Sequence, residues 1–398
     1  MITLLIATAF AAEVMVGLDA PTVQDAVDQA EPGDVVVIPD GNWDGPVTIS
    51  KALTITSKGG VLVGRGGSTL RIESEGVTVD RLNIEGSGSN LRGPDSCIYV
   101  SDQATGARIS NSMLWNCLFG VWAQGVADAQ IVNNDIEGRR HSGPANKGNG
   151  IHLHNCERLE VRQNTVRDAR DGIYVSATND SMIVENNVSN QRFGIHYMYS
   201  YRNEIRDNVA NNNSGGIALM QSRDLKVINN NTDNNRRHGV LFRDTIDSVI
   251  SGNSAKGNNE GFFFFSSVRN TISGNFLSNN TIGMRVWAGT VENKIQDNAF
   301  INNRQQVFYV ASEDQEWGSN FWSDYQGWDQ NNDGVGDRVY RSEAFTSRLL
   351  YRYPAAVLLL SSPTIELLAH LQARVPALQI PSVVDRAPLL KTPIRKSP

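Results

Sequence analysis

The chain of 398 residues has little of what several protein classes require. It contains three cysteines and no Cys-x-x-Cys pair, so at most one disulfide can form, and zinc bound by cysteine alone is not supported. The 36 basic residues do not exceed the 42 acidic ones, and the net charge is −6, which argues against a nucleic-acid binder with a basic stripe. The late apolar run from Ala355 to Leu360 is far shorter than the roughly 20 residues of a membrane-spanning helix.

Asparagine and glycine are abundant instead. The chain has 39 asparagines and 35 glycines, and both residues are poor in helix interiors and favoured at turns. The apolar fraction of 40% and the charged fraction of 20% are nevertheless those of a chain that buries a core. This combination argues against a helical bundle or a doubly wound α/β enzyme and favours many short strands separated by turns.

A glycine followed by an apolar residue recurs with one period through the middle of the chain. The spacings are 22, 22, 22, 23, 22 and 22 residues, and a comb of asparagines keeps step with them. Before the first of these glycines an insert of polar, loop-like residues, 138–145, interrupts the period. The glycines are Gly150, Gly172, Gly194, Gly216, Gly239, Gly261 and Gly283, and the asparagines are Asn164, Asn186, Asn208, Asn230, Asn253, Asn275 and Asn298.

Each repeat reads as three short strands whose side chains alternate with period two, as in Ile195-His196-Tyr197-Met198. Three strands in about 22 residues, repeated, predict the coils of an all-β, right-handed parallel β-helix. A fixed asparagine in each coil can stack, with its amide bonding to the next turn. A leucine-rich repeat is excluded because the Leu-x-x-Leu-x-Leu spacing is absent.

The ends of such a solenoid need covering, because an open end exposes unpaired backbone. Thr22 is a plausible helix N-cap, and Val23, Ala26, Val27 and Ala30 form the apolar stripe of a capping helix. The repeat decays near residue 310. We therefore expect five segments: an export signal over 1–12, the cap over 13–34, the β-helix over 35–312, an irregular loop region over 313–348 and a Pro-rich, apolar, partly helical tail over 349–398. The alternative for residues 1–12 is a buried N-terminal segment.

Stacked coils place equivalent residues in columns about 4.8 Å apart. The two columns predicted to face outward after each glycine carry His152 and His196 in one, and His154, Met198 and Met220 in the other. Thioether and imidazole ligands suit Cu(I) and poorly suit Mg²⁺ or Ca²⁺. These five residues are therefore the candidate copper ligands; the alternative is that the methionines cover apolar surface and the histidines are simply exposed.

The same columns continue as an apolar stripe. Phe262 to Phe265 cannot all point inward on one strand, and contiguous exposed aromatic side chains usually mark a partner surface. The alternative is that the C-terminal segment folds back over them. The predicted partner-binding residues are Leu241, Phe263, Phe265 and Trp287 on the columns, with Ile365, Leu368 and Leu371 on a short helix after Ser362-Pro363 in the tail.

An aspartate-rich segment resembles a calcium loop. Asp329, Asn331, Asp333 and Asp337 supply oxygen atoms at positions 1, 3, 5 and 9, with a glycine at position 6. Position 12 is Tyr340 where an EF-hand has glutamate. We expect either a calcium site or a loop rich in Asx turns.

Evidence for catalysis is weak. Pectin-degrading β-helices need clustered carboxylates or a basic residue beside bound Ca²⁺, whereas Asp171, Asp244 and Asp247 are scattered over different coils. The dipeptide His238-Gly239 is similar to one found in glycosidases, but paired aspartates do not accompany it. We therefore expect no enzymatic activity. Cys156 aligns with small corner residues of later coils and is expected to be structural.

The C-terminal part carries a more specific pattern. Its elements are Asn320-Phe-Trp-Ser-Asp-Tyr325, Gly327-Trp-Asp329, Asp333-Gly-Val-Gly-Asp337, Tyr353-Pro354, Ser362-Pro363 and Pro388-Leu389. With His196-Tyr-Met-Tyr-Ser200, the chain resembles the NosD family, periplasmic maturation proteins of nitrous oxide reductase, and the repeats resemble the carbohydrate-binding and sugar-hydrolase class of β-helices. The resemblance covers essentially the whole chain after the signal.

The resemblance implies a non-catalytic, exported protein that works with a membrane ABC-type permease and its cytoplasmic ATPase. It also implies that a copper chaperone takes part and that the copper-sulfur centres of nitrous oxide reductase are the product. No ligand residue is carried over from the family, so the His/Met candidates depend on the column argument alone. The alternative function is a polysaccharide-binding or polysaccharide-cleaving β-helix.

Overall fold

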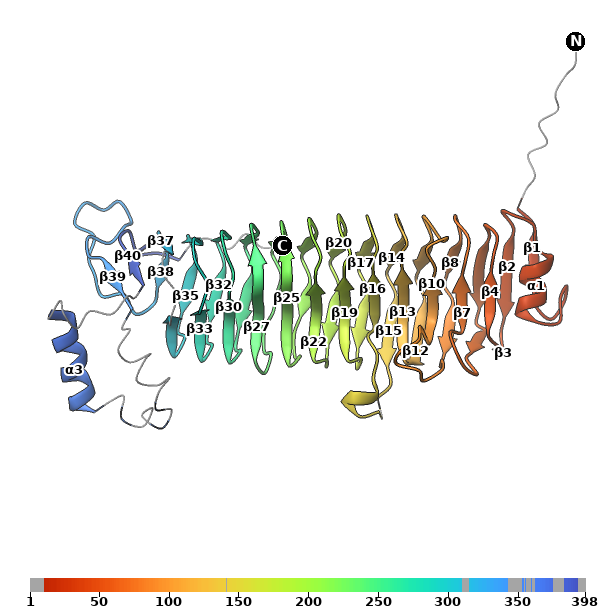
Figure 1. Ribbon diagram of the computed structural model, residues 1–398, viewed down its shortest axis with the longest axis horizontal. Coiled ribbons are helices and arrows are strands. Elements are labelled where there is room, and N and C mark those ends of the chain that lie inside the picture. Colours follow the sequence, from red (N-terminus) through yellow and green to blue (C-terminus); the bar gives the residue numbers. More distant parts are fainter. Residues whose placement is uncertain are drawn as a thin grey trace, which may run out of the picture. The chain divides into compact units, whose positions relative to one another are not determined.

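The structure is a computed structural model that describes residues 11–140, 142–309, 315–342, 353, 355, 359, 362–374 and 383–392. The chain forms two compact units, an N-terminal unit over 1–187 and a C-terminal unit over 188–398, and each is described by itself. Both are stacks of short parallel strands (Figure 1), which confirms the predicted all-β parallel β-helix. Most of the predicted export signal lies outside the described residues. None of the described helices is long and apolar enough to cross a membrane.

In the N-terminal unit each coil contributes one strand to each of three parallel sheets, so that neighbouring strands in a sheet are three elements apart in the chain. The first sheet is β1 (Glu13–Met15), β2 (Val35–Pro39), β5 (Thr54–Lys58), β8 (Thr78–Asp80), β11 (Arg108–Ser110), β14 (Gln130–Val132), β17 (Glu160–Arg162) and β20 (Met182–Val184). The second is β4 (Val47–Ile49), β7 (Leu70–Ile72), β10 (Ser96–Val100), β13 (Phe119–Gln124), β16 (Ile151–His154) and β19 (Asp171–Ser176). The third is β3 (Asn42–Asp44), β6 (Val61–Val63), β9 (Asn83–Glu85), β12 (Met113–Cys117), β15 (Asp135–Gly138) and β18 (Thr165–Arg167), and β21 (Asn187–Ser189) lies at the division between the units.

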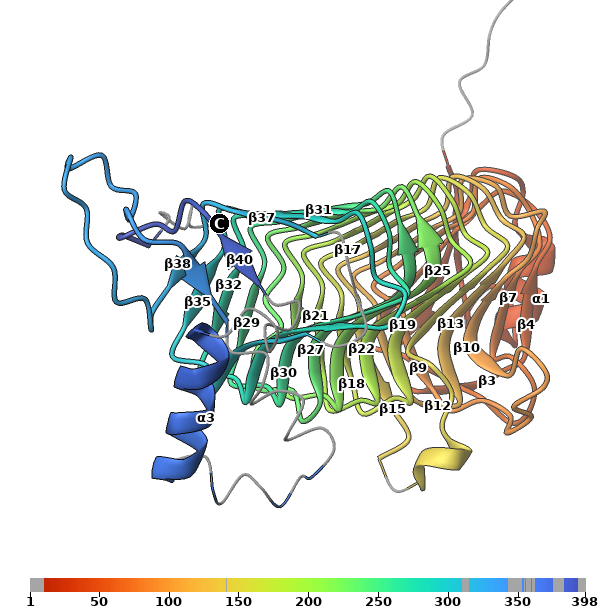
Figure 2. The same ribbon diagram turned by 60° about the vertical axis from the view of Figure 1, so that its left-hand side comes forward.

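The C-terminal unit repeats this arrangement (Figure 2). Its first sheet is β23 (Glu204–Arg206), β26 (Lys226–Ile228), β28 (Val249–Ser251), β31 (Thr271–Ser273), β34 (Lys294–Gln296) and β37 (Glu316–Gly318). Its second sheet is β22 (Phe193–Met198), β25 (Gly215–Arg223), β27 (His238–Ile246), β30 (Glu260–Phe265), β33 (Ile282–Trp287) and β36 (Gln305–Tyr309). The strand β24 (Val209–Ala210) belongs to the third sheet. A separate four-stranded sheet is formed by β29 (Ser254–Lys256), β32 (Phe276–Ser278), β35 (Ala299–Ile301) and β38 (Phe321–Trp322). The coils thus continue about ten residues beyond 312, where we expected them to end.

The interior of each unit is filled by apolar side chains, because alternate residues along each strand point inward. In β30, Phe262 and Phe264 are buried (0% and 2% exposed), while Phe263 and Phe265 are only partly covered, as the run of four phenylalanines required. Phe264 stacks on Phe242 of the preceding coil with ring centroids 4.2 Å apart. Stacked apolar side chains of this kind supply the main favourable term in folding.

The periodic glycines sit where one coil touches the next. A Cβ atom added to Gly216 would lie 2.5 Å from the carbonyl oxygen of Gly239, and one added to Gly239 would lie 2.7 Å from that of Gly261. Real Cβ atoms do not approach backbone so closely. The glycine comb is therefore a steric requirement of stacking coils without a gap.

The asparagine comb forms buried hydrogen-bonded ladders, as predicted. In the C-terminal unit the side-chain amide of Asn253 donates to Asn275 (3.0 Å), Asn275 to Asn298 (2.9 Å) and Asn298 to Asn320 (3.0 Å). In the N-terminal unit Asn164 donates to Asn186 (3.0 Å). A second asparagine ladder, which we did not predict, has the same period and consists of Asn213, Asn235, Asn258, Asn280 and Asn303.

The N-terminal cap forms largely as expected. The helix α1 (Val23–Gln29) begins after Thr22, whose hydroxyl accepts a hydrogen bond from the backbone N–H of Asp25 (3.1 Å). Val23, Ala26 and Val27 are buried. Before the helix, however, β1 pairs with β2 in parallel, so part of the expected cap is already a strand of the first sheet.

The C-terminal end of the solenoid is closed by a distant segment. The strand β40 (Val384–Asp385) pairs antiparallel with β39 (Tyr340–Arg341). Asp385 is fully buried, and its Oδ2 accepts hydrogen bonds from the backbone and side-chain nitrogens of Asn320 (3.0 and 3.2 Å) and from the indole of Trp322 (3.0 Å). The carboxylate of Asp385 thus takes the place of the next asparagine in the ladder.

Candidate functional site

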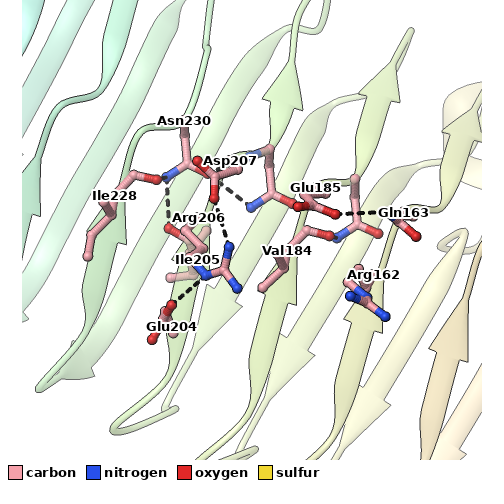
Figure 3. Close-up of polar contacts among 12 residues, drawn as sticks. Arg162, Gln163, Val184, Glu185, Glu204, Ile205, Arg206, Asp207, Ile228 and Asn230 are labelled. Carbon is pink, nitrogen blue, oxygen red and sulfur yellow. Dashed lines mark hydrogen bonds and ion pairs between the residues drawn. The ribbon is translucent and has the colours of Figure 1, made fainter. Parts of the chain in front are cut away.

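The outer side of the first sheet carries ion pairs and polar contacts. In the C-terminal unit Arg206 lies 2.6 Å from Glu204 and 2.8 Å from Asp207, and in the N-terminal unit Gln163 donates to Glu185 at 2.9 Å (Figure 3). The hydrogen bond with Asp207 raises the pKa of Arg206. These are half-exposed contacts of small energetic value, and they offer no soft metal ligand.

Two methionines lie side by side on the outer face of the second sheet in the C-terminal unit. Met198 in β22 is the direct register partner of Met220 in β25. Both side chains are partly exposed. Neighbouring strands are about 4.8 Å apart, so the two thioethers can reach one ion between them.

His196 is less accessible than its column position predicted. It is only 5% exposed, its ring centroid is 5.0 Å from that of Phe193, and its Nδ1 lies 3.4 Å from a terminal nitrogen of Arg192. Since a guanidinium only donates, Nδ1 is the acceptor in this contact. The column neighbours Ala218 and Leu241 are also buried (0% and 9% exposed), so this column is covered, while the column of Met198 and Met220 is partly exposed. His196 would have to leave Arg192 to bind a metal through Nδ1.

The two other candidate histidines belong to the N-terminal unit. His152 stacks on Trp122, with centroids 4.1 Å apart and planes inclined by 4°, and it lies edge-on to Phe119 at 5.5 Å. The side-chain amide of Asn149 contacts its Nδ1 at 3.1 Å. His154, two residues later on the same strand, is exposed. The structure therefore presents His154 to solvent and packs His152 into an aromatic box.

Burial in this box lowers the pKa of His152 from 6.5 to about 4, and the neighbouring His154 contributes to the shift. An imidazole with that pKa is neutral at pH 7. The neutral ring accepts the amide hydrogen bond from Asn149 and keeps its stacking partner.

Acid should therefore destabilise the metal-free protein through His152. The unfolded chain protonates near pH 6.5 and the folded chain near pH 4, so this contribution is fully present above pH 6.5 and is lost as the pH falls towards 4. We expect a loss of about 3 kcal/mol over that interval. Urea unfolding at a series of pH values measures it. His152→Phe should flatten the dependence, whereas His154→Gln should weaken it only in part, because the larger cause, burial of His152, remains. A pH profile unchanged by His152→Phe would contradict this assignment.

The cysteines supply no soft ligand. Cys97 and Cys117 form a disulfide with Cα atoms 5.6 Å apart, consistent with at most one disulfide. Cys156 is buried, its backbone N–H contacts Thr178 of the next coil (3.3 Å), and burial raises the pKa of its thiol. A raised pKa keeps the thiol protonated and unsuited to metal binding.

The predicted apolar stripe is only partly exposed. Phe263, Phe265 and Trp287 are partly covered outward-facing residues of β30 and β33, whereas Leu241 is buried. Arg285 lies between Phe263 and Trp287, with its guanidinium carbon 5.4 and 5.2 Å from their ring centroids. The surface is therefore aromatic and cationic rather than purely apolar.

The tail helix α3 (Pro363–Arg374) begins at the predicted proline. Leu367 and Leu371, one turn apart, are 59% and 43% exposed, and Ile365 is partly covered. The side chain of Leu368 lies outside the described residues. An exposed pair at i and i+4 marks one apolar edge of the helix.

The aspartate-rich loop uses its oxygens internally. The carboxylate of Asp329 accepts hydrogen bonds from the backbone N–H groups of Asp333 (3.2 Å) and Gly334 (2.9 Å). The side-chain oxygen of Asn331 accepts one from the backbone of Asp333 (3.3 Å), and the carboxylate of Asp337 accepts one from the backbone of Gln330 (2.7 Å). No group of three or more His, Cys, Asp or Glu side chains that could hold a metal occurs among the described residues. The geometry is that of an Asx-turn loop, and nothing in it supports calcium.

Three residues that we did not predict as a group come together on the second sheet of the C-terminal unit. His238 and Glu260 are buried (6% and 3% exposed) and lie 2.7 Å apart, and Glu260 is 2.9 Å from Arg285. Both His238 and Glu260 directly precede a periodic glycine. The period alone could therefore have placed them side by side.

Comparison with known proteins adds three findings. A family profile described as "Periplasmic copper-binding protein (NosD)" matches residues 133–327. A "Probable ABC transporter binding protein NosD" of Stutzerimonas stutzeri is 37% identical over 380 residues, covering 90% of this chain and 87% of the relative. A protein of the same description from Pseudomonas aeruginosa is 37% identical over 373 residues, covering 89% and 87%.

Solved structures are similar in fold. The receptor-binding protein of bacteriophage Det7, a tailspike, superposes with a TM-score of 0.57 at 11% identity, over 85% of this chain and 81% of that chain. A family 28 exopolygalacturonase of Yersinia enterocolitica superposes with a TM-score of 0.56 at 11% identity, over 77% and 78%. At this identity the likeness concerns the β-helix alone.

Proposed function

Because the chain belongs to the NosD family, we propose that it is a non-catalytic periplasmic protein that helps to assemble the copper-sulfur centres of nitrous oxide reductase. It would act with an ABC-type permease, its cytoplasmic ATPase and a copper chaperone. The family description, periplasmic and copper-binding, supports the compartment and the cargo. The relatives' description as ABC transporter binding proteins supports the partner. The Cys97–Cys117 disulfide fits an oxidising compartment.

The observation that carries the proposal is the pair formed by Met198 and Met220. Two thioethers on neighbouring strands are the soft donors that Cu(I) prefers, and their partial exposure lets an ion arrive and leave. Copper is the cargo here, so a weak, open site suits the task better than a closed cage. His196 would complete the site after release from Arg192, and exposed His154 is a separate soft donor in the N-terminal unit.

The tail helix is the proposed contact with the permease. Leu367 and Leu371 expose apolar surface that the described residues do not cover, and such a helix edge fits a groove on a partner. The aromatic and cationic surface of β30 and β33 is a second docking surface. Aromatic residues and arginine are the types most enriched in protein interfaces.

The function can be tested in denitrifying cells that lack their own copy of this protein. The wild-type chain should restore the copper content of purified nitrous oxide reductase and should co-purify with the permease. Leu367→Glu with Leu371→Glu should lower the copper content of the reductase and the yield of co-purified permease by about tenfold or more. Both leucines would become buried in the complex, and glutamate would lose that apolar contact. Exposed Thr364→Glu on the same helix is the matched control and should behave like wild type.

Two outcomes would contradict the proposal. One is a reductase that acquires full copper without the chain. The other is robust cleavage of polyuronates by the purified chain with Ca²⁺, which would favour the polysaccharide-cleaving alternative.

A further inference from the structure

A charged cluster is buried on the outer side of the second sheet in the C-terminal unit. His238 begins β27, Glu260 begins β30, and Arg285 lies in β33, so three successive coils contribute one residue each. The Nδ1 of His238 is 2.7 Å from one oxygen of Glu260, and the Nε of Arg285 is 2.9 Å from the other. The side chain of Glu260 is 4% exposed and that of His238 is 8% exposed.

The fold itself does not require charge at this place. The register partner of Glu260 in the next coil is Ile282, which fills the equivalent position with an apolar side chain. Burying a carboxylate is costly unless its partners satisfy it fully. Here the Oε2 of Glu260, the Nδ1 of His238 and the Nε of Arg285 lie at ion-pair distances but outside hydrogen-bond geometry. The cluster thus bears a cost that an isoleucine would avoid.

The effect of the cluster is to hold one guanidinium in place. The guanidinium carbon of Arg285 is 4.9, 5.2 and 5.4 Å from the ring centroids of Phe308, Trp287 and Phe263. Aromatic faces attract the planar cation and fix its orientation. A guanidinium ordered in advance loses little freedom when it binds a ligand.

Arg285 still has binding capacity. Its side chain is 24% exposed, and the ion pair with Glu260 is made at Nε. Among the residues that the structure describes, the charged partner of Arg285 is Glu260. A guanidinium with a free edge binds a second carboxylate through paired, charge-assisted hydrogen bonds.

We propose that Arg285 receives a carboxylate that a docking protein segment carries beside an apolar side chain, with Glu260 and His238 as positioning residues. Phe263 and Trp287 would receive the apolar side chain. We commit to a protein segment because the surface around Arg285 combines aromatic rings with arginine, the residue types most enriched in protein interfaces. The inference rests on the proposed role of this surface in docking and specifies the chemistry of what docks there.

The test uses the isolated full-length chain and a minimal probe, N-acetylphenylalanine, which joins a carboxylate to an aromatic ring. Its neutral amide, N-acetylphenylalaninamide, is the paired probe. Binding is followed by ligand-observed nuclear magnetic resonance. The acid should bind about tenfold more tightly than the amide to the wild-type chain. Arg285→Gln should abolish that preference, and Arg243→Gln, which removes an exposed guanidinium 5.7 Å from Phe265, should retain it.

Glu260→Gln tests positioning. In this variant the preference for the acid should shrink, while the affinity for the amide is kept. A loss of structure would weaken binding of both probes. Circular dichroism checks that the variant is folded. Equal binding of acid and amide to the wild-type chain, or a preference that survives Arg285→Gln, would overturn the proposal. Arg285-dependent binding of trigalacturonate without any acid preference would assign the site to a sugar instead. Neither copper nor permease is present, so failure here and failure of the proposed function are distinguishable.

Discussion

Replacing Asp385 by alanine should lower the free energy of unfolding of the C-terminal unit by about 3–5 kcal/mol. The fully buried carboxylate accepts hydrogen bonds from both nitrogens of Asn320 and from the indole of Trp322, and its other oxygen accepts the backbone N–H of Ala387 (3.0 Å). Alanine would leave these donors without an acceptor and without access to water. Urea unfolding, with hydrogen exchange over residues 316–322, measures the loss and its place.

A carboxylate at the same end of the unit provides the control. Glu316 is 71% exposed and lies 3.6 Å from Lys294, so Glu316→Ala should change stability by less than about 1 kcal/mol. Asp385→Asn keeps the shape of the side chain but places an amide N–H against a donor. Its loss of unfolding free energy should fall between those of Asp385→Ala and Glu316→Ala. If Asp385→Ala unfolds at the same urea concentration as Glu316→Ala, the distant segment does not close the solenoid.

Removing the two thioethers should lower the affinity of the chain for Cu(I) by about 100-fold, or ~2.7 kcal/mol. The change is Met198→Leu with Met220→Leu, a pair of substitutions that conserve volume and apolar character and so leave the packing intact. Competition with a coloured Cu(I) chelator measures the affinity. Either single substitution should have a smaller effect, because one thioether remains.

An exposed methionine elsewhere provides the matched control. Met182 in β20 is 42% exposed and has no methionine as its register partner in β17, where it lies opposite Glu160. Met182→Leu should leave Cu(I) affinity unchanged. Equal losses in the control and in the double variant would show that thioethers bind copper nonspecifically.

Much of the fold is predictable because the solenoid repeats its requirements in every coil. The period of Gly239 and its equivalents reflects contact between successive carbonyls, and the period of Asn253 reflects a ladder of amides. Alternation along strands correctly assigns Phe262 and Phe264 to the interior. The second asparagine ladder, which includes Asn258, was equally visible in the spacing.

The closure of the C-terminal end was not predictable in this way. Asp385 contacts Asn320 across 65 residues, and a single contact of that span leaves no period in the sequence. The pairing of Cys97 with Cys117 likewise depends on how β10 and β12 meet.

For the candidate site, the repeat period correctly predicts that Met198 lies opposite Met220. It did not reveal the burial of His196 and Leu241, because column position gives the direction of a side chain and not what covers it. The aromatic box around His152 also depends on Phe119 and Trp122, which precede the insert and fall outside the regular comb. The residue that lies next to a given side chain in the following coil is therefore predictable from the period. Which outward-facing side chains are buried by other residues is not.

We propose that Met198 and Met220 together hold Cu(I). X-ray absorption at the copper edge, on the full chain loaded with one equivalent of Cu(I), tests it most directly. The wild-type spectrum should show sulfur scatterers around copper, and the spectrum of the double leucine variant should retain only nitrogen or oxygen. A wild-type spectrum without sulfur, or an identical spectrum from the variant, would contradict the claim.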